Sequence, residues 1–171
     1  PLEMDNSYFN LPGDKESKRV EITGSDRWAK LKGWGPTKFI SESGGLSSAA
    51  EDYLHFEQML LNGGELFGHQ LLRPARVKQM SSNQVGDLYS DVAGRKKGRR
   101  GMGFGYTVAV TMNPKAAANN RAKGAFGWGG ALGTMSWTDP ENELVAVLML
   151  QQPHGGTQRD FGKAVQQAII K

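Results

Sequence analysis

The chain has 171 residues, of which 38% are apolar, and a net charge of +4. This length predicts a single domain spanning residues 1–171 with one hydrophobic core, and no apolar stretch is long enough to cross a membrane. The absence of cysteine excludes disulfides and thiolate metal sites, and the three histidines are not spaced as metal ligands. We therefore expect neither a metal nor another cofactor.

The first third of the chain is rich in turns and leads into a helix. It begins with Pro1 rather than Met, which suggests a processed or partial chain. Val20–Thr23 is interpreted as a short strand. Ser48 followed by Glu51 fits a capping box and predicts a helix over about 48–62, which ends at Asn62-Gly63-Gly64. Its helically spaced apolar residues are interpreted as core: Tyr53, Phe56, Met59 and Leu60.

Two smaller elements and a long loop follow. Leu66–Leu72 is expected to form a turn-and-strand unit, and Arg73-Pro74-Ala75 opens a second helix that runs to about Ser81. Asn83–Gly101 has the composition of a loop, and it contains Arg95-Lys96-Lys97-Gly98-Arg99-Arg100. This basic run suits a nucleic-acid or anionic surface. No nucleic-acid-binding module surrounds it, so we favour a solvated loop.

The second half of the chain predicts consecutive strands and a closing helix. Gly103–Thr111 is interpreted as one strand, and Lys115–Lys123 as a polar connection. Leu144–Leu150 has no polar member, as expected for a strand covered on both faces. A helix at about 158–170 carries one apolar stripe, formed by Phe161, Ala164, Val165, Ala168 and Ile169. Helices, then strands, then a helix predict an α+β fold with an antiparallel sheet flanked by helices.

The stretch Ala125–Trp137 is unusual because it is dense in glycine. Glycines 127, 129, 130 and 133 lie between strand-forming aromatic residues, although glycine adds no side chain to pack. Such a run is typical of a strand, or a bent pair of strands, whose backbone comes close to another backbone or to a ligand. A tight turn at Asp139–Asn142 then leads to the next strand.

Four landmarks occur in order along the chain. They are Pro1-Leu2-x-Met4-x-x-Ser7-Tyr8-Phe9, Gly44-Gly45-Leu46-Ser47-Ser48-Ala49-x-Glu51-Asp52-Tyr53, Gly101-Met102-Gly103-Phe104-Gly105-Tyr106 and Phe126-Gly127-Trp128-Gly129-Gly130-Ala131. Together they resemble serine hydrolases of the β-lactamase and penicillin-binding-protein fold, especially class C β-lactamases and related esterases. The last landmark resembles the esterase-like form of a motif that is Lys-Thr-Gly or His-x-Gly elsewhere in the family.

The resemblance implies a partial β-lactamase/transpeptidase-like domain in which the strand holding this motif forms one wall of an active site. The backbone N–H of Ala131 then corresponds to one of two oxyanion-hole donors, the other being the N–H of the nucleophilic serine. Gly129 and Gly130 would leave space for a small ester or β-lactam-like substrate. Trp128 stands where a cationic lysine is found elsewhere, which favours neutral esters. The alternative interpretation of Trp128 is simple strand packing.

The chain departs from the family at the catalytic residues. No serine has a lysine three residues later, so the Ser-x-x-Lys nucleophile is missing. Tyr8-Phe9-Asn10 matches the family's Tyr-x-Asn base in letters but lies in the first landmark, and we interpret it as a chance match. We therefore expect the C-terminal portion of a carboxylesterase or β-lactamase-like enzyme, inactive without its N-terminal portion.

The resemblance also implies a structural partner. In the family, the strand that matches Leu144–Leu150 is paired by a strand near the N-terminus, which is absent here. Because an open apolar edge is prone to association, we expect it to be covered by a missing N-terminal segment, a second copy, or a rearranged part of residues 1–47. The resemblance favours a bacterial protein that is periplasmic or secreted, while the residues themselves do not decide the compartment.

Two other hypotheses stay open at this point. One is a non-catalytic relative or remnant whose groove only binds. The other, which we favour less, is a basic nucleic-acid-binding domain that relies on residues 95–100.

Overall fold

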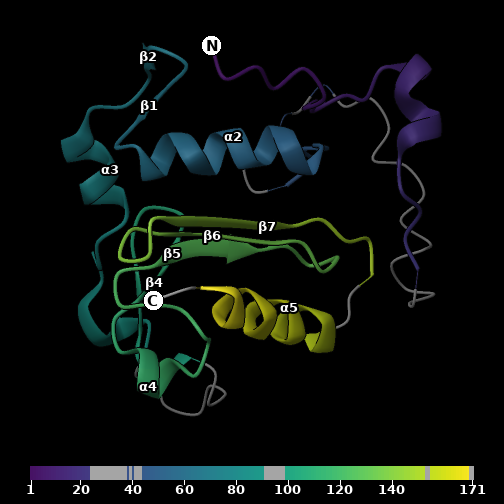
Figure 1. Ribbon diagram of the computed structural model, residues 1–171. Helices are drawn as coiled ribbons and strands as arrows, with labels where there is room; N and C mark the ends of the chain where they lie inside the picture. Colours follow the sequence, from purple (N-terminus) through teal and green to yellow (C-terminus); the bar gives the residue numbers. More distant parts are fainter. Residues whose placement is uncertain (24–37, 39, 41–43, 91–98, 153–154, 170–171) are drawn as a thin grey trace.

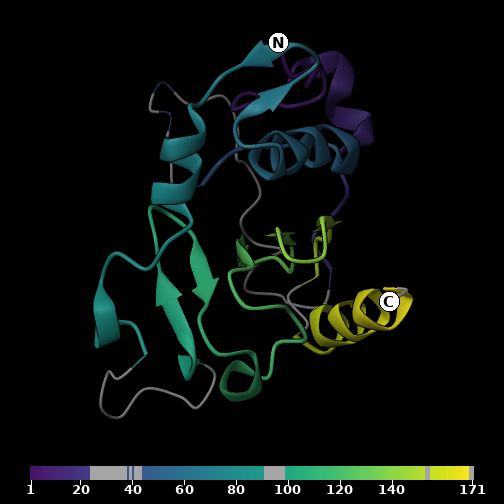
Figure 2. The same ribbon diagram turned by 60° about the vertical axis from the view of Figure 1, so that its left-hand side comes forward.

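The computed structural model describes residues 1–23, 38, 40, 44–90, 99–152 and 155–169. Its centre is a five-stranded antiparallel sheet with strand order β3-β4-β5-β6-β7. The strands are β3 (Met102–Phe104), β4 (Ala109–Thr111), β5 (Phe126–Gly129), β6 (Met135–Asp139) and β7 (Leu144–Leu148). Helices α2 (Ala50–Leu61) and α5 (Gly155–Ala168) cover opposite faces of the sheet, as both views show (Figures 1 and 2). The predicted α+β fold, with an antiparallel sheet flanked by helices, is confirmed.

Smaller elements surround this sheet. A separate hairpin of β1 (Glu65–Leu66) and β2 (His69–Gln70) forms the predicted turn-and-strand unit. Helix α3 (Pro74–Met80) begins with its proline in the first turn, as predicted. The remaining short helices are η1 (Gly13–Lys18), η2 (Gly86–Leu88) and α4 (Pro114–Ala117). No helix in these described ranges has the length and apolar character needed to cross a membrane.

Helix α2 lies on β6 and β7, and its Asp52 accepts hydrogen bonds from the N-terminal segment at Asn6 and Ser7. It ends as predicted, with Gly63 and Gly64 at positive φ and the Gly64 N–H donating to the Met59 carbonyl over 2.8 Å. The predicted capping box at its start is wrong, because Ala49 is the N-cap and no side chain caps the helix. The Ser48 hydroxyl instead lies 2.6 Å from the Ser7 hydroxyl.

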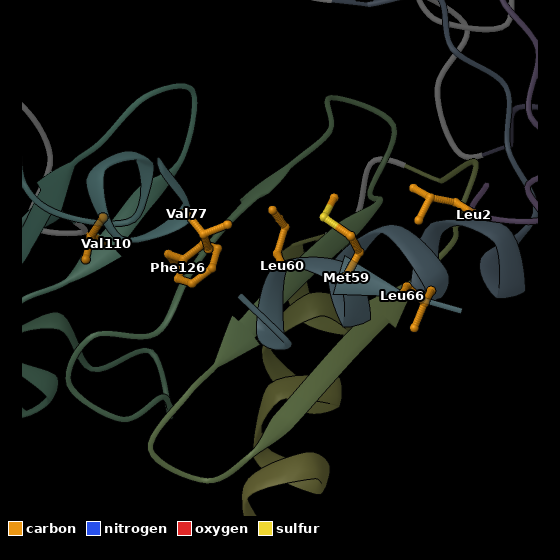
Figure 3. Close-up of a cluster of buried hydrophobic side chains, with 7 residues drawn as sticks. All are labelled: Leu2, Met59, Leu60, Leu66, Val77, Val110 and Phe126. Carbon is orange, nitrogen blue, oxygen red and sulfur yellow. The ribbon is translucent and has the colours of Figure 1, made fainter. Parts of the chain in front are cut away.

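Two apolar clusters form the core. The larger one brings α2, α3 and β1 against β4 and β5, and Figure 3 shows its members: Leu2, Met59, Leu60, Leu66, Val77, Val110 and Phe126. The second lies beneath α5 and consists of Ala125, Trp137 and Ala146, with Phe161 and Val165 packed against them. Complete burial of each large side chain contributes about 1.5–3 kcal/mol relative to its exposure. These clusters hold the sheet between its two helices.

Some of the strand predictions are wrong. Gly103–Thr111 is not one strand but the hairpin of β3 and β4, because Gly105 turns the chain and its N–H donates to the Val108 carbonyl. A side chain at Gly105 would collide with the Met80 carbonyl at the end of α3. Val20–Thr23 is not a strand either, and Val20 is largely exposed.

The closing helix differs from its prediction in extent and in its buried face. Helix α5 begins at Gly155, earlier than the predicted residue 158. Phe161 and Val165 pack on the sheet, whereas Ala164 and Ala168 are exposed. The buried stripe is therefore narrower than the apolar periodicity indicated.

Candidate active site

Strand β5 is paired along its whole length on one side only. Its pairing with β6 runs from Phe126↔Thr138 to Gly129↔Met135. On the other side, β4 pairs only with Phe126 and Gly127. From Trp128 onward, this second side of the backbone has no strand partner among the described residues. A substrate or another chain segment can therefore approach the backbone of residues 128–131.

The glycine-dense stretch is a bent pair of strands joined by a turn, which confirms that part of the prediction. The Gly130 N–H donates to the Thr134 carbonyl over 2.8 Å, and the Gly133 N–H donates to the Gly130 carbonyl over 3.1 Å. Gly130–Gly133 is therefore a β-turn with Ala131 at its second position. Neither Ala131 nor Leu132 has positive φ, as in a type I turn.

The N–H of Ala131 is available to an external acceptor. The Gly130 carbonyl accepts a hydrogen bond from the Gly133 N–H inside the turn, and in a trans peptide the N–H of the next residue points the opposite way. The N–H of Ala131 is therefore directed out of the turn, toward the open side of β5. It donates to no residue in the described part of the chain, and Ala131 is exposed. These properties suit the oxyanion-hole role predicted for Ala131, which stays a prediction.

Helix α5 holds this turn in place. The side-chain amide of Gln158 donates to the carbonyls of Gly133 and Thr134, each over 3.2 Å. A side chain at Gly133 would collide with the carbonyl of Gln152. Gln158 was not predicted as a site residue, because a polar residue on an amphipathic helix is expected to face solvent and nothing in the sequence links it to a turn 25 residues earlier.

The two adjacent glycines have local structural reasons to lack a side chain. At Gly130, a Cβ atom would collide with the Thr134 hydroxyl. At Gly129, it would lie 3.4 Å from the Thr134 carbonyl oxygen, which is tight but close to ordinary contact. Space for a substrate beside Gly129 and Gly130 stays a prediction, since the packing of the turn already accounts for Gly130.

Trp128 lies beside the candidate oxyanion position and is half exposed, at 51%. Its ring contacts Phe104 edge to face, with centroids 5.5 Å apart. A tryptophan that served only strand packing would be buried, as Trp137 is on the next strand, where it is 1% exposed. Trp128 therefore presents aromatic surface at the open end of β5.

A buried polar cluster lies between α2 and β6, next to this strand. Glu57 is 3% exposed and accepts a hydrogen bond of 2.6 Å from the Thr138 hydroxyl. Burial raises the pKa of the Glu57 carboxyl, while hydrogen bonds from Ser136 and Thr138 and the charge of Arg121 oppose that rise. Burial also raises the pKa of the Tyr53 hydroxyl, and the Glu57 charge adds to the effect.

Arg121 completes this charged interior from the other side of β6. Its guanidinium lies 4.5 Å from the centre of the Trp137 ring. Burial lowers the Arg121 pKa to about 10, against the opposing charges of Glu57 and Asp139. Helical spacing from Tyr53 places Glu57 on the inward face, so the burial of this residue could have been predicted from the sequence pattern. We interpret the cluster as structural, because its carboxyl is closed off from solvent.

Several other predicted features lie away from this strand or outside the described residues. Tyr8 lies in the N-terminal segment, where its hydroxyl donates to the Asp5 carbonyl and its backbone pairs with Ser47. Of the basic run at 95–100, only Arg99 and Arg100 are described. The described residues contain no group of three or more His, Cys, Asp or Glu that could hold a metal ion.

The fold and the strand motif define a known class of protein. The family model described as Beta-lactamase matches residues 1–169, and the chain therefore belongs to the Beta-lactamase family. The resemblance found in the sequence is confirmed at this level.

Particular relatives are similar over nearly the whole chain. Two Mycobacterium tuberculosis proteins, "Uncharacterized protein MT1414" and "Protein Rv1367c", are each 31% identical over 169 residues. Among solved structures, Simvastatin Synthase (LovD) from Aspergillus terreus has a TM-score of 0.74 at 19% identity. "EstCE1, a hydrolase with promiscuous acyltransferase activity" has a TM-score of 0.71 at 20% identity. The two structural similarities show a shared fold.

The chain corresponds to only part of these relatives. The alignments with the two mycobacterial proteins cover 88% of this chain but 40% of each relative. Those with LovD and EstCE1 cover 99% of this chain and 47% of the other chain. The part described here thus spans less than half the length of each of these relatives.

Proposed function

We propose that this chain is the C-terminal portion of a serine hydrolase, and that it supplies the oxyanion-hole strand of an esterase-type active site. The observation that carries the proposal is the N–H of Ala131, which donates to no described residue and lies in an exposed turn beyond the point where β4 stops pairing with β5. Similarity to a hydrolase with acyltransferase activity supports this reaction class.

The proposed chemistry divides the work between two portions of the protein. A serine from a Ser-x-x-Lys segment attacks the ester carbonyl, and its proton passes to a base outside this chain. The carbonyl oxygen becomes an oxyanion, which accepts hydrogen bonds from the Ala131 N–H and the serine N–H. Collapse of this tetrahedral intermediate expels the alcohol and leaves an acyl-serine, which water then hydrolyses. Each such donor typically accounts for about 10²–10³ in turnover.

The aromatic surface of Trp128 favours a neutral ester over a β-lactam. At this position the ring offers an apolar wall and no charge for a substrate carboxylate. A small ester that carries no charged group beside Trp128 is therefore the proposed substrate class, and a β-lactam is the alternative.

The same portion that supplies the serine is the proposed cover for β7. This strand ends the sheet order among the described residues, and its residues Leu144–Leu148 are all apolar. Residues 1–23 approach its far end, where the Thr23 N–H donates to the Gln151 carbonyl over 2.9 Å. A second copy of the chain is the competing occupant of this edge.

The test compares the chain alone with the chain joined to the Ser-x-x-Lys portion of its full coding sequence. A fluorophosphonate probe should label only the joined protein, and p-nitrophenyl acetate should be hydrolysed only by it. Replacing the motif serine by alanine is the matched control. Labelling of the chain alone would contradict the prediction that it contains no nucleophilic serine. Absence of both activities in the joined protein would favour the non-catalytic binding relative, and preferential cleavage of nitrocefin would favour the β-lactam alternative.

A further inference from the structure

Three aromatic rings form a continuous row that starts at Trp128. The Trp128 ring meets Phe104 edge to face at 5.5 Å between centroids. Phe104 in turn contacts Tyr89, with centroids 5.0 Å apart. The three residues come from β5, from β3 and from the segment directly after η2, so tertiary packing alone brings them together. The row therefore runs from β5 to β3 and on to the segment after η2.

A guanidinium closes the far end of this row. The Arg99 guanidinium carbon lies 4.7 Å from the centre of the Tyr89 ring. Among the described residues no carboxylate lies within ion-pair distance of Arg99. A stacked guanidinium keeps its N–H groups at its edge, where they suit the two oxygens of a carboxylate. Within the described part of the chain, its charge is therefore not offset by an acidic side chain.

We propose that this row, defined as Trp128, Phe104, Tyr89 and Arg99, selects esters whose bound group is apolar and ends in a carboxylate. The inference rests on the proposed function, because it takes the group lying on Trp128 to be part of the ester substrate. The apolar part lies along the three rings, and the terminal carboxylate pairs with Arg99. The reacting carbonyl then remains next to Ala131.

Different parts of the row supply apolar contact and charge. Half-exposed Trp128 and the partly buried rings of Phe104 and Tyr89 offer aromatic surface, and none of these three side chains carries a positive charge. A neutral apolar group gains only from these rings, whereas a group with a terminal carboxylate also gains the ion pair. The positive charge that is missing at the position of Trp128 is therefore present at the other end of the row, on Arg99.

The test uses two ligands that cannot be hydrolysed as esters, 4-phenylbutyrate and its neutral analogue 4-phenylbutyramide. Binding to the chain is followed through the Trp128 indole N–H signal in the NMR spectrum, assigned with Trp128→Phe. The acid should bind about three- to tenfold more tightly than the amide, as expected for a partly exposed charge-assisted contact. The preference should disappear in Arg99→Gln and weaken with added salt.

Arg100→Gln is the matched control, because it removes the same charge from the exposed neighbouring position. It should keep the preference for the acid. Equal affinities in the unaltered chain, persistence of the preference in Arg99→Gln, equal loss in both variants, or no change at Trp128 would each overturn the inference. Hydrolysis of p-nitrophenyl acetate by the joined protein without any acid preference would refute this inference alone. Acid preference without ester turnover would instead refute the proposed function.

Discussion

Ala131→Pro tests the oxyanion role with little disturbance of the fold. Proline is favoured at the second position of a type I turn, where Ala131 lies, because its φ is already near −65°. The substitution removes the Ala131 N–H, and that group donates no hydrogen bond within the described chain. The preceding Gly130 tolerates the restriction that proline places on its neighbour. We therefore expect the free energy of unfolding to change by less than about 1 kcal/mol.

The catalytic effect should be much larger than the effect on stability. Loss of one oxyanion donor typically lowers turnover by about 10²–10³, or about 2.7–4 kcal/mol of transition-state stabilisation. The assay is hydrolysis of p-nitrophenyl acetate by the joined protein, with kcat and KM determined separately. Because the oxyanion forms only in the transition state, kcat should fall while KM stays nearly constant.

Ala131→Ser is the control, since it keeps the backbone N–H and changes only an exposed side chain. It should retain the unaltered kcat. If Ala131→Pro folds normally and loses less than about tenfold in kcat, corresponding to about 1.4 kcal/mol, the N–H of Ala131 is not an oxyanion donor.

Three further predictions concern the interior and the turn. Glu57→Gln should raise the free energy of unfolding at pH 8 by on the order of 1 kcal/mol and flatten its pH profile. The reason is that burial raises the folded-state pKa of Glu57, so the unaltered protein loses stability as pH rises from the ordinary pKa of 4.5 through the raised one. The control Glu51→Gln, at an exposed position, should change neither the free energy of unfolding nor its pH profile. Urea unfolding at several pH values measures both quantities. Gln158→Ala should lower kcat without a comparable loss of stability, because the turn loses both side-chain hydrogen bonds. The control Gln167→Ala, on the exposed face of α5, should leave kcat unchanged. Equal kcat in the two variants would contradict the positioning role of Gln158. Trp137→Ala should cost about 3–5 kcal/mol in urea unfolding, and a loss below 1 kcal/mol would show that the cluster beneath α5 contributes little.

Much of the fold could be predicted because its signals are local. The apolar run in Leu144–Leu150, the glycines after α2 and the proline at the start of α3 each act through neighbouring residues. The hairpin of β3 and β4 could not be predicted in this way. Its turn at Gly105 depends on contact with the Met80 carbonyl, and alternation of side chains alone does not distinguish one strand from two short ones.

The candidate site shows the same division. The motif around Trp128 and Ala131 was identified from sequence, because its glycines and aromatic residue are contiguous. Gln158 was missed, since its bonds to the turn join residues from different elements. The row from Trp128 to Arg99 likewise could not be predicted from the sequence, because its four members come from separate segments that only packing brings together.

The sequence by itself determined the family landmarks, the main helices and the strand expected to carry the oxyanion donor. It also determined that no serine in this chain has the lysine partner of the family's nucleophile. Only the tertiary structure decided that β4 pairs with β5 no further than Gly127 and that α5 secures the adjoining turn. The physical reason is that composition and spacing encode the preferences of individual elements, whereas a free N–H and its surroundings arise from the contacts between them.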